Sequence, residues 1–154
     1  MTAIDLSAQL EEIRLKYPKW WLSEDAQREL QSLWGDAPCN EHGLRPADEN
    51  ITIELDRQWT ACVQIARAPN GWYAFAVSYA YGIGGGGAAI SVWNNTAYTS
   101  RQETFEAGIR TLKLTYQRLL DCQNFPPETQ KTNAARMIAL LDQHLLQSRQ
   151  LSLF

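Results

Sequence analysis

The sequence contains few of the groups from which catalytic and metal sites are usually built. Only two histidines and three cysteines occur among its 154 residues. His42 and His144 are far apart, no serine lies in a nucleophile-elbow pattern, and no carboxylate pair has a spacing that forces a shared site. We therefore expect no catalytic residue and no cofactor, while noting that folding can assemble a site from distant segments.

The cysteines are odd in number and widely separated, at Cys39, Cys62 and Cys122. With no apolar leader in the sequence, this pattern predicts free thiols and a cytoplasmic protein. Cys39 and His42 have the spacing of a zinc-ligand pair, but a structural zinc site needs four ligands. We expect no metal here and interpret the segment around 36–50 as an exposed loop.

Excess positive charge and long apolar runs are also missing. There are 14 Lys and Arg residues against 17 Asp and Glu residues, and the basic residues are scattered singly. Duplex DNA binding usually requires a basic face or arm, so we do not expect direct duplex binding. No apolar run approaches the length that spans a membrane.

The apolar content of 45% is enough for one compact domain with a core. Apolar residues recur at helical spacing after Asp5 and again after Ser23, both of which are good N-cap residues. Ser100 and Glu103 form a capping box before a longer helix, and a further helix starts near Glu128. These last two helices are predicted to be an antiparallel pair.

Between the helix pairs the apolar period changes to two, which predicts strands. The predicted strands are Ile51–Leu55, Trp59–Ile65, Trp72–Tyr81 and Ala88–Trp93. The sequence therefore predicts an α+β fold of order α-α-β-β-β-β-α-α, with a four-stranded antiparallel sheet packed against helices.

The third predicted strand has two different faces. Its small face, on which helices could approach closely, carries Ala74, Ala76, Ser78 and Ala80. Its aromatic face carries Tyr73, Phe75, Tyr79 and Tyr81. An open aromatic face can stack the bases of single-stranded nucleic acid, but the flanking Lys and Arg that such sites use are missing. A buried aromatic core or a partner surface is the other interpretation.

A glycine run follows this strand, comprising Gly82, Gly84, Gly85, Gly86 and Gly87. Glycine-rich loops can cradle phosphate, but a phosphate loop opens into a helix and carries Lys and Ser or Thr. This run instead precedes a predicted strand. We interpret it as a flexible connection and a possible contact loop.

The last five residues of the sequence are Gln150, Leu151, Ser152, Leu153 and Phe154. This peptide resembles the short motif by which bacterial polymerases and repair factors bind the hydrophobic cleft of the DNA sliding clamp. The resemblance covers these five residues only. It implies that Leu153 and Phe154 enter an apolar pocket while the Gln150 amide forms hydrogen bonds at its rim.

The apolar stripe of the last helix ends at Leu145 or Leu146, before this motif begins. We therefore expect a single domain over residues 1–148 and a separate tail over residues 149–154. The resemblance implies a non-enzymatic adaptor of bacterial, phage or mobile-element DNA replication or repair, recruited to the sliding clamp, whose body engages a further protein partner. A single-strand-binding module, or a structural or oligomeric domain whose tail packs on itself, are the alternatives.

Overall fold

The structure is a computed structural model that describes residues 3–122 and 128–151. Its helices are α1 (Ser7–Lys16), α2 (Glu24–Leu33), α3 (Arg101–Asp121) and α4 (Glu128–Leu151), with a short 3-10 helix η1 (Trp20–Leu22). Its strands are β1 (Ala3–Asp5), β2 (Glu49–Asp56), β3 (Trp59–Arg67), β4 (Tyr73–Tyr81), β5 (Gly85–Gly87) and β6 (Thr96–Tyr98). The α+β class is confirmed, but the sheet has six strands in the order β1-β6-β4-β3-β2, with β5 paired to β4.

The centre of the sheet is the β3–β4 hairpin, which is paired in register from Trp59 opposite Tyr81 to Arg67 opposite Tyr73. Its turn contains Gly71, whose φ of 89° is the left-handed conformation that glycine adopts without strain. The amide of Ala68 donates to the carbonyl of Trp72 at 2.7 Å and closes the turn. The second and third predicted strands therefore form a hairpin, with Gly71 in its turn.

The predicted fourth strand over Ala88–Trp93 is wrong. Ile90 and Val92 are buried, as their alternation suggested, but the segment makes only one isolated bridge, from Ser91 to Leu44. Local hydrogen bonds replace a ladder: the Ser91 amide donates to Asn94 Oδ1 at 2.7 Å, and the Trp93 amide donates to Ser91 Oγ at 3.0 Å. Such side chains compete with the backbone pairing of a strand.

β1 and β6, which the sequence pattern did not predict, lie at the edge of the sheet opposite β2. β1 pairs with β6 from Ala3 opposite Tyr98 to Asp5 opposite Thr96, and β6 joins β4 through Tyr73 and Tyr98. Asp5 is thus the last residue of β1, and its carboxylate accepts a hydrogen bond from the Ser7 amide at 2.9 Å. Each strand has three residues, too few to establish a period.

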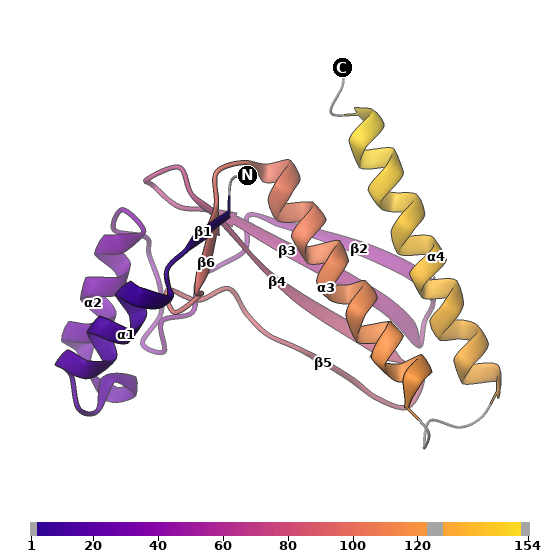
Figure 1. Ribbon diagram of the computed structural model, residues 1–154, viewed down its shortest axis with the longest axis horizontal. Coiled ribbons are helices and arrows are strands. Elements are labelled where there is room, and N and C mark those ends of the chain that lie inside the picture. Colours follow the sequence, from indigo (N-terminus) through magenta and orange to yellow (C-terminus); the bar gives the residue numbers. More distant parts are fainter. Residues whose placement is uncertain (1–2, 123–127, 152–154) are drawn as a thin grey trace.

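The helices pack in two groups, which lie apart in Figure 1. α3 and α4 run antiparallel across one face of the sheet, whereas α1 and α2 form a lobe at one end of it. Each group has its own apolar cluster. The α3–α4 cluster includes Ile53, Trp59, Val63, Ile65, Ile109, Leu112, Tyr116, Met137 and Leu141. The α1–α2 cluster includes Leu6, Leu10, Leu30, Trp34, Ala66, Ala74, Ala76, Ile90 and Val92.

α3 approaches the sheet closely because the helix has a glycine, Gly108, at the contact. A Cβ atom added to Gly108 would lie 2.6 Å from Val63 Cγ1, so only glycine fits this position without movement. α3 therefore covers the face that carries the large β4 side chains. Of the small β4 residues, Ala74 and Ala76 contact the α1–α2 cluster instead.

Farther along α3, the fully buried Tyr116 ties the helix to the two central strands. Its hydroxyl lies 2.7 Å from the carbonyl oxygen of Thr60 and 3.1 Å from that of Ala80, which face each other across the β3–β4 ladder. Burial raises the pKa of this phenol far above its ordinary value, so it remains a hydrogen-bond donor.

We expect Gly108→Ala to destabilise the protein by about 1–2 kcal/mol. A glycine-to-alanine change in a helix interior normally stabilises by about 1 kcal/mol, whereas overpacking a core costs about 1–3 kcal/mol. The contact with Val63 makes the second effect larger. Urea unfolding measures the change, with Gln143→Ala on the exposed side of α4 as the control. A Gly108→Ala variant as stable as the parent would contradict the described approach of α3.

Candidate functional site at the end of α4

α4 carries the first two residues of the clamp-like motif beyond the rest of the domain. Its C-terminal end projects past the sheet and past the start of α3 (Figure 1). Gln150 and Leu151 are exposed, and Leu151 retains 75% of its accessible surface. Ser152, Leu153 and Phe154 lie outside the described residues.

α4 continues to Leu151, whereas the sequence predicts a separate tail that starts at residue 149. Arg149, Gln150 and Leu151 form its last turn, and no glycine or proline interrupts α4 from Glu128 onward. Gln, Arg and Leu are good helix formers, so the backbone stays helical after the buried stripe has ended. Ser148 is the last residue of α4 that is partly buried.

Two polar contacts hold the end of α4 against the beginning of α3. Gln102 Nε2 donates to Ser148 Oγ at 2.9 Å, and that hydroxyl donates to the Leu145 carbonyl at 2.7 Å. Arg149 Nε donates to Glu106 Oε1 at 2.6 Å. The Gln102–Ser148 and Arg149–Glu106 contacts each join residues more than forty positions apart in sequence. No local pattern reveals such contacts, and sequence analysis missed them.

The Glu106–Arg149 contact makes this attachment sensitive to acid. The hydrogen bond from Arg149 holds the pKa of Glu106 below its ordinary value of 4.5. A carboxylate with a lowered folded-state pKa contributes stability above the unfolded pKa and loses it as the pH falls through the folded value. The attachment is therefore complete at neutral pH and weakens below about pH 4.5.

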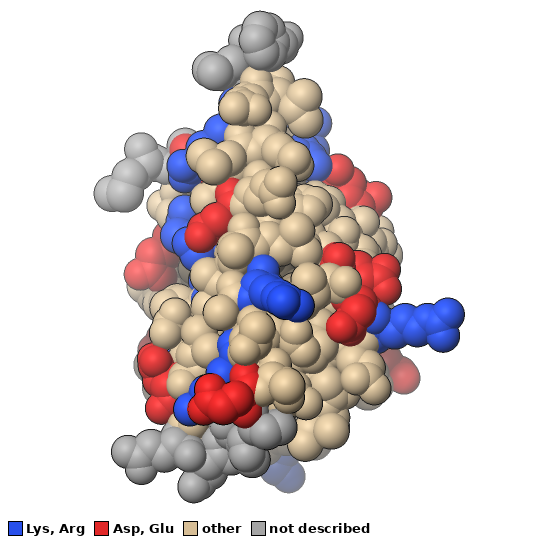
Figure 2. All heavy atoms as spheres, turned by 90° about the vertical axis from the view of Figure 1, so that its right-hand side faces the viewer, with Lys and Arg blue, Asp and Glu red and all other residues tan. Residues whose placement is uncertain are grey.

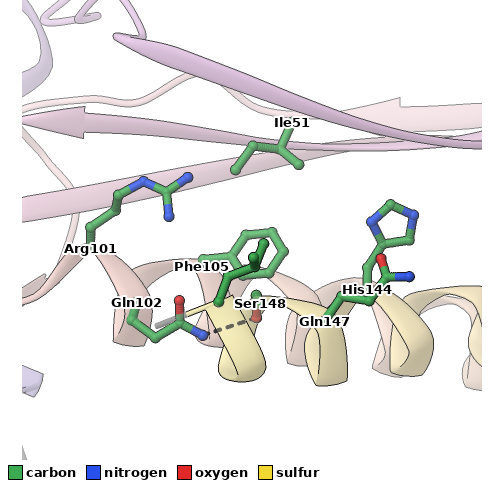
Figure 3. Close-up of a pocket in the computed structure, with 8 residues that line it drawn as sticks. Ile51, Arg101, Gln102, Phe105, His144, Gln147 and Ser148 are labelled. Atoms are coloured by element: carbon green, nitrogen blue, oxygen red, sulfur yellow. Dashed lines mark hydrogen bonds between the residues drawn. The ribbon is translucent and has the colours of Figure 1, made fainter. Parts of the chain in front are cut away.

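A pocket of about 370 Å³ lies beside this attachment, between β2, α3 and α4 (Figure 3). Ile51 of β2 and Phe105 of α3 are apolar lining residues, and His144 and Gln147 of α4 also line the pocket. Leu151 also lines it. The motif therefore begins at the rim of a partly apolar hollow.

Arg101 is the charged residue at the other end of this pocket, and it is already paired. Its Nε and Nη2 atoms each lie 2.8 Å from a carboxylate oxygen of Glu49. The hydrogen bonds from Arg101 lower the pKa of Glu49. The pair leaves His144, Ser148 and the amide side chains of Gln102 and Gln147 as the other polar groups in the lining.

The four aromatic residues of β4 lie under α3 and are half-buried. Tyr73, Phe75, Tyr79 and Tyr81 all pack against the α3–α4 cluster. The Tyr79 and Tyr81 rings are stacked with centroids 6.1 Å apart, and Tyr79 meets the edge of Tyr116. This packing differs from the open face that base stacking uses, and it favours the interpretation as core.

The glycine run is part strand, because Gly85–Gly87 pair with Ser78–Ala80 as β5. A Cβ atom on Gly86 would lie 2.7 Å from the Tyr79 hydroxyl, and one on Gly84 would lie 2.7 Å from the Tyr81 ring. The two tyrosine rings thus lie across a backbone that has no side chains. Gly82 instead has a φ of 75° and makes the turn out of β4.

No group of three or more His, Cys, Asp or Glu side chains that could hold a metal occurs in residues 3–122 and 128–151. Cys39 Sγ accepts a hydrogen bond from Gln27 Nε2 at 3.3 Å, and the His42 side chain is 73% exposed beside Glu41. The three cysteines are free thiols. The zinc-like spacing is therefore not accompanied by further ligands in this part of the chain.

No family model, curated protein or solved structure matches this chain. Within the described residues, no helix combines the length and apolar character needed to cross a bilayer.

We expect Arg149→Ala to raise the pKa of Glu106 toward 4.5, because it removes the charged hydrogen-bond donor. Carboxyl-carbon NMR titration measures this pKa. Arg118→Ala, a change elsewhere on α3, is the control and should leave it unchanged. An equally low Glu106 pKa in both variants would show that Arg149 does not hold the end of α4.

Proposed function

We propose that the protein is a non-enzymatic adaptor of bacterial DNA replication or repair that binds the DNA polymerase sliding clamp through Gln150–Phe154. The observation that carries the proposal is the position of Leu151, which is 75% exposed at the tip of a projecting helix. An apolar residue there adds nothing to the core of its own domain. Docking in an apolar cleft of a partner would bury it.

The energetics suit a recruitment signal. Burying an apolar side chain of this size contributes roughly 1.5–3 kcal/mol, and the motif offers Leu151, Leu153 and Phe154. Ordering the peptide and losing translational freedom offset much of this gain, which leaves affinity in the micromolar range. The last turn of a helix frays readily, so Gln150 and Leu151 can become extended on binding at little cost.

The charge of the domain also fits recruitment by a protein rather than by DNA. Residues 101–151, which include both long helices, contain seven Lys and Arg and five Asp and Glu. Figure 2 shows both signs on the face that α4 covers, without a continuous basic surface. Because its electrostatic attraction to phosphate is weak, the domain would be recruited by the peptide motif and not by direct binding to DNA.

The two alternatives have less support. A structural domain whose tail packs on itself would bury the motif, but Leu151 is largely exposed. A single-strand-binding module needs open aromatic rings, whereas those of β4 are half-buried beside α3. The clamp proposal places the protein in a bacterial cytoplasm, as a host, phage or mobile-element product.

Isothermal titration calorimetry of the full chain against a purified bacterial sliding clamp tests the proposal. We expect a Kd on the order of micromolar. The double change Leu153→Ala, Phe154→Ala should weaken binding at least about a hundredfold, because truncation of central apolar anchors costs about 2 kcal/mol or more each.

Leu146→Ala is the matched control, because Leu146 is 60% exposed on the same helix but lies outside the motif. It should bind like the parent. No heat of binding for the parent, or equal affinity for parent and double variant, would contradict the proposal.

A further inference from the structure

A second hollow, of about 410 Å³, lies in the α1–α2 lobe. Figure 1 shows this lobe and the tip of α4 at opposite ends of the molecule. We call this hollow the tryptophan pocket, and its defining residues are Trp20, Trp21, Trp93, Glu24, Glu41 and His42. They come from η1, the first turn of α2 and two loops. The pocket therefore exists only in the folded chain.

Three of the six tryptophans meet in this pocket. The Trp20 ring lies 5.4 Å from Trp21 in an edge-to-face arrangement and 4.7 Å from Trp93 in a tilted one. Trp21 is 60% exposed. Trp34 and Trp59, in contrast, are fully buried in the core. An exposed indole beside two others marks a binding surface rather than a core contact.

The aromatic rings here already attract a cation of the protein itself. The Arg14 guanidinium carbon lies 5.0 Å from the Trp20 ring centroid and 5.8 Å from that of Trp93. Indole faces hold cations by the negative charge of the π system. Arg14 covers Trp20 and Trp93, whereas the adjoining Trp21 has no cation over it within the described residues.

The carboxylates of the pocket favour a cationic ligand as well. Glu24 makes no ion pair or hydrogen bond through its side chain with any residue in 3–122 or 128–151, and the only ionic partner of Glu41 there is the neighbouring His42, at 3.4 Å. The one guanidinium in the lining, that of Arg28, lies 3.7 Å from Asp25. The positive end of α2 also points here, but Ser23 Oγ caps it by accepting from the Ala26 amide.

We propose that the tryptophan pocket binds a basic side chain, a lysine ammonium or an arginine guanidinium, presented by a partner protein. The ligand's cation lies against Trp21 and forms ion pairs with Glu24 and Glu41. The carboxylates of Glu24 and Glu41 and the exposed indole of Trp21 disfavour phosphate and other anions at this site. The inference does not depend on clamp binding, because the pocket and the motif are at opposite ends of the molecule.

NMR of the tryptophan indole N–H groups tests this proposal with a capped tetralysine peptide as the probe. We expect the Trp20, Trp21 and Trp93 resonances to shift with millimolar affinity, and those of Trp34, Trp59 and Trp72 to remain in place. Raising the salt to about 1 M should weaken the interaction, because the Debye length falls to about 3 Å. A capped tetraserine peptide should cause no shift.

Two sets of variants separate the roles of the ring and the charges. Trp21→Ala should weaken tetralysine binding at least fivefold, and so should the double change Glu24→Gln, Glu41→Gln. A fivefold loss corresponds to about 1 kcal/mol, the size of a cation–π contact. The double change Glu11→Gln, Glu54→Gln removes the same charge from exposed positions elsewhere and should leave binding unchanged.

Several results would overturn the proposal. They are the absence of shifts with tetralysine, equal shifts with tetraserine, and equal loss in the pocket and control charge variants. Shifts of the three pocket indoles with the neutral sugar cellobiose but not with tetralysine would assign the pocket to carbohydrate instead.

Discussion

The close contact of α3 with the sheet at Gly108 and Val63 is the constraint on which the rest of the structure depends. It brings the helix near enough for the buried Tyr116 hydroxyl to bond the carbonyl oxygens of Thr60 and Ala80. α4 then packs beside α3 and over β2, which fixes the direction in which its last turn leaves the domain. The exposure of Leu151 is thus a consequence of helix packing far from the motif.

Sequence patterns predicted the elements whose signals are local. The β3–β4 hairpin follows from strict alternation and a turn glycine, and α3 begins where Ser100 Oγ accepts from the Glu103 amide. β1 and β6 could not be predicted, because three-residue strands are specified by pairing across more than ninety residues. β5 consists only of glycine and has no strand propensity of its own. That α3 also covers the face with the large β4 side chains could not be predicted from β4, because the small residue at this contact is Gly108 in α3.

The two candidate binding regions also differ in whether a local sequence pattern reveals them. The motif at Gln150–Phe154 is contiguous, so its resemblance is visible in the sequence alone. The tryptophan pocket is assembled from segments near residues 20, 41 and 93, and only the fold brings them together. The two proposed regions lie at opposite ends of the molecule, so partners bound at them would not compete for one surface.

Clamp binding through Gln150–Phe154 can be tested by displacement of a fluorescent client peptide from the cleft of a bacterial sliding clamp, followed by anisotropy. We predict that the intact chain displaces the peptide at micromolar concentration. A chain ending at Arg149 should melt at the same temperature and displace nothing. Displacement by that shortened chain, or none by the intact chain, would contradict the assignment of Gln150–Phe154 as the clamp-binding element.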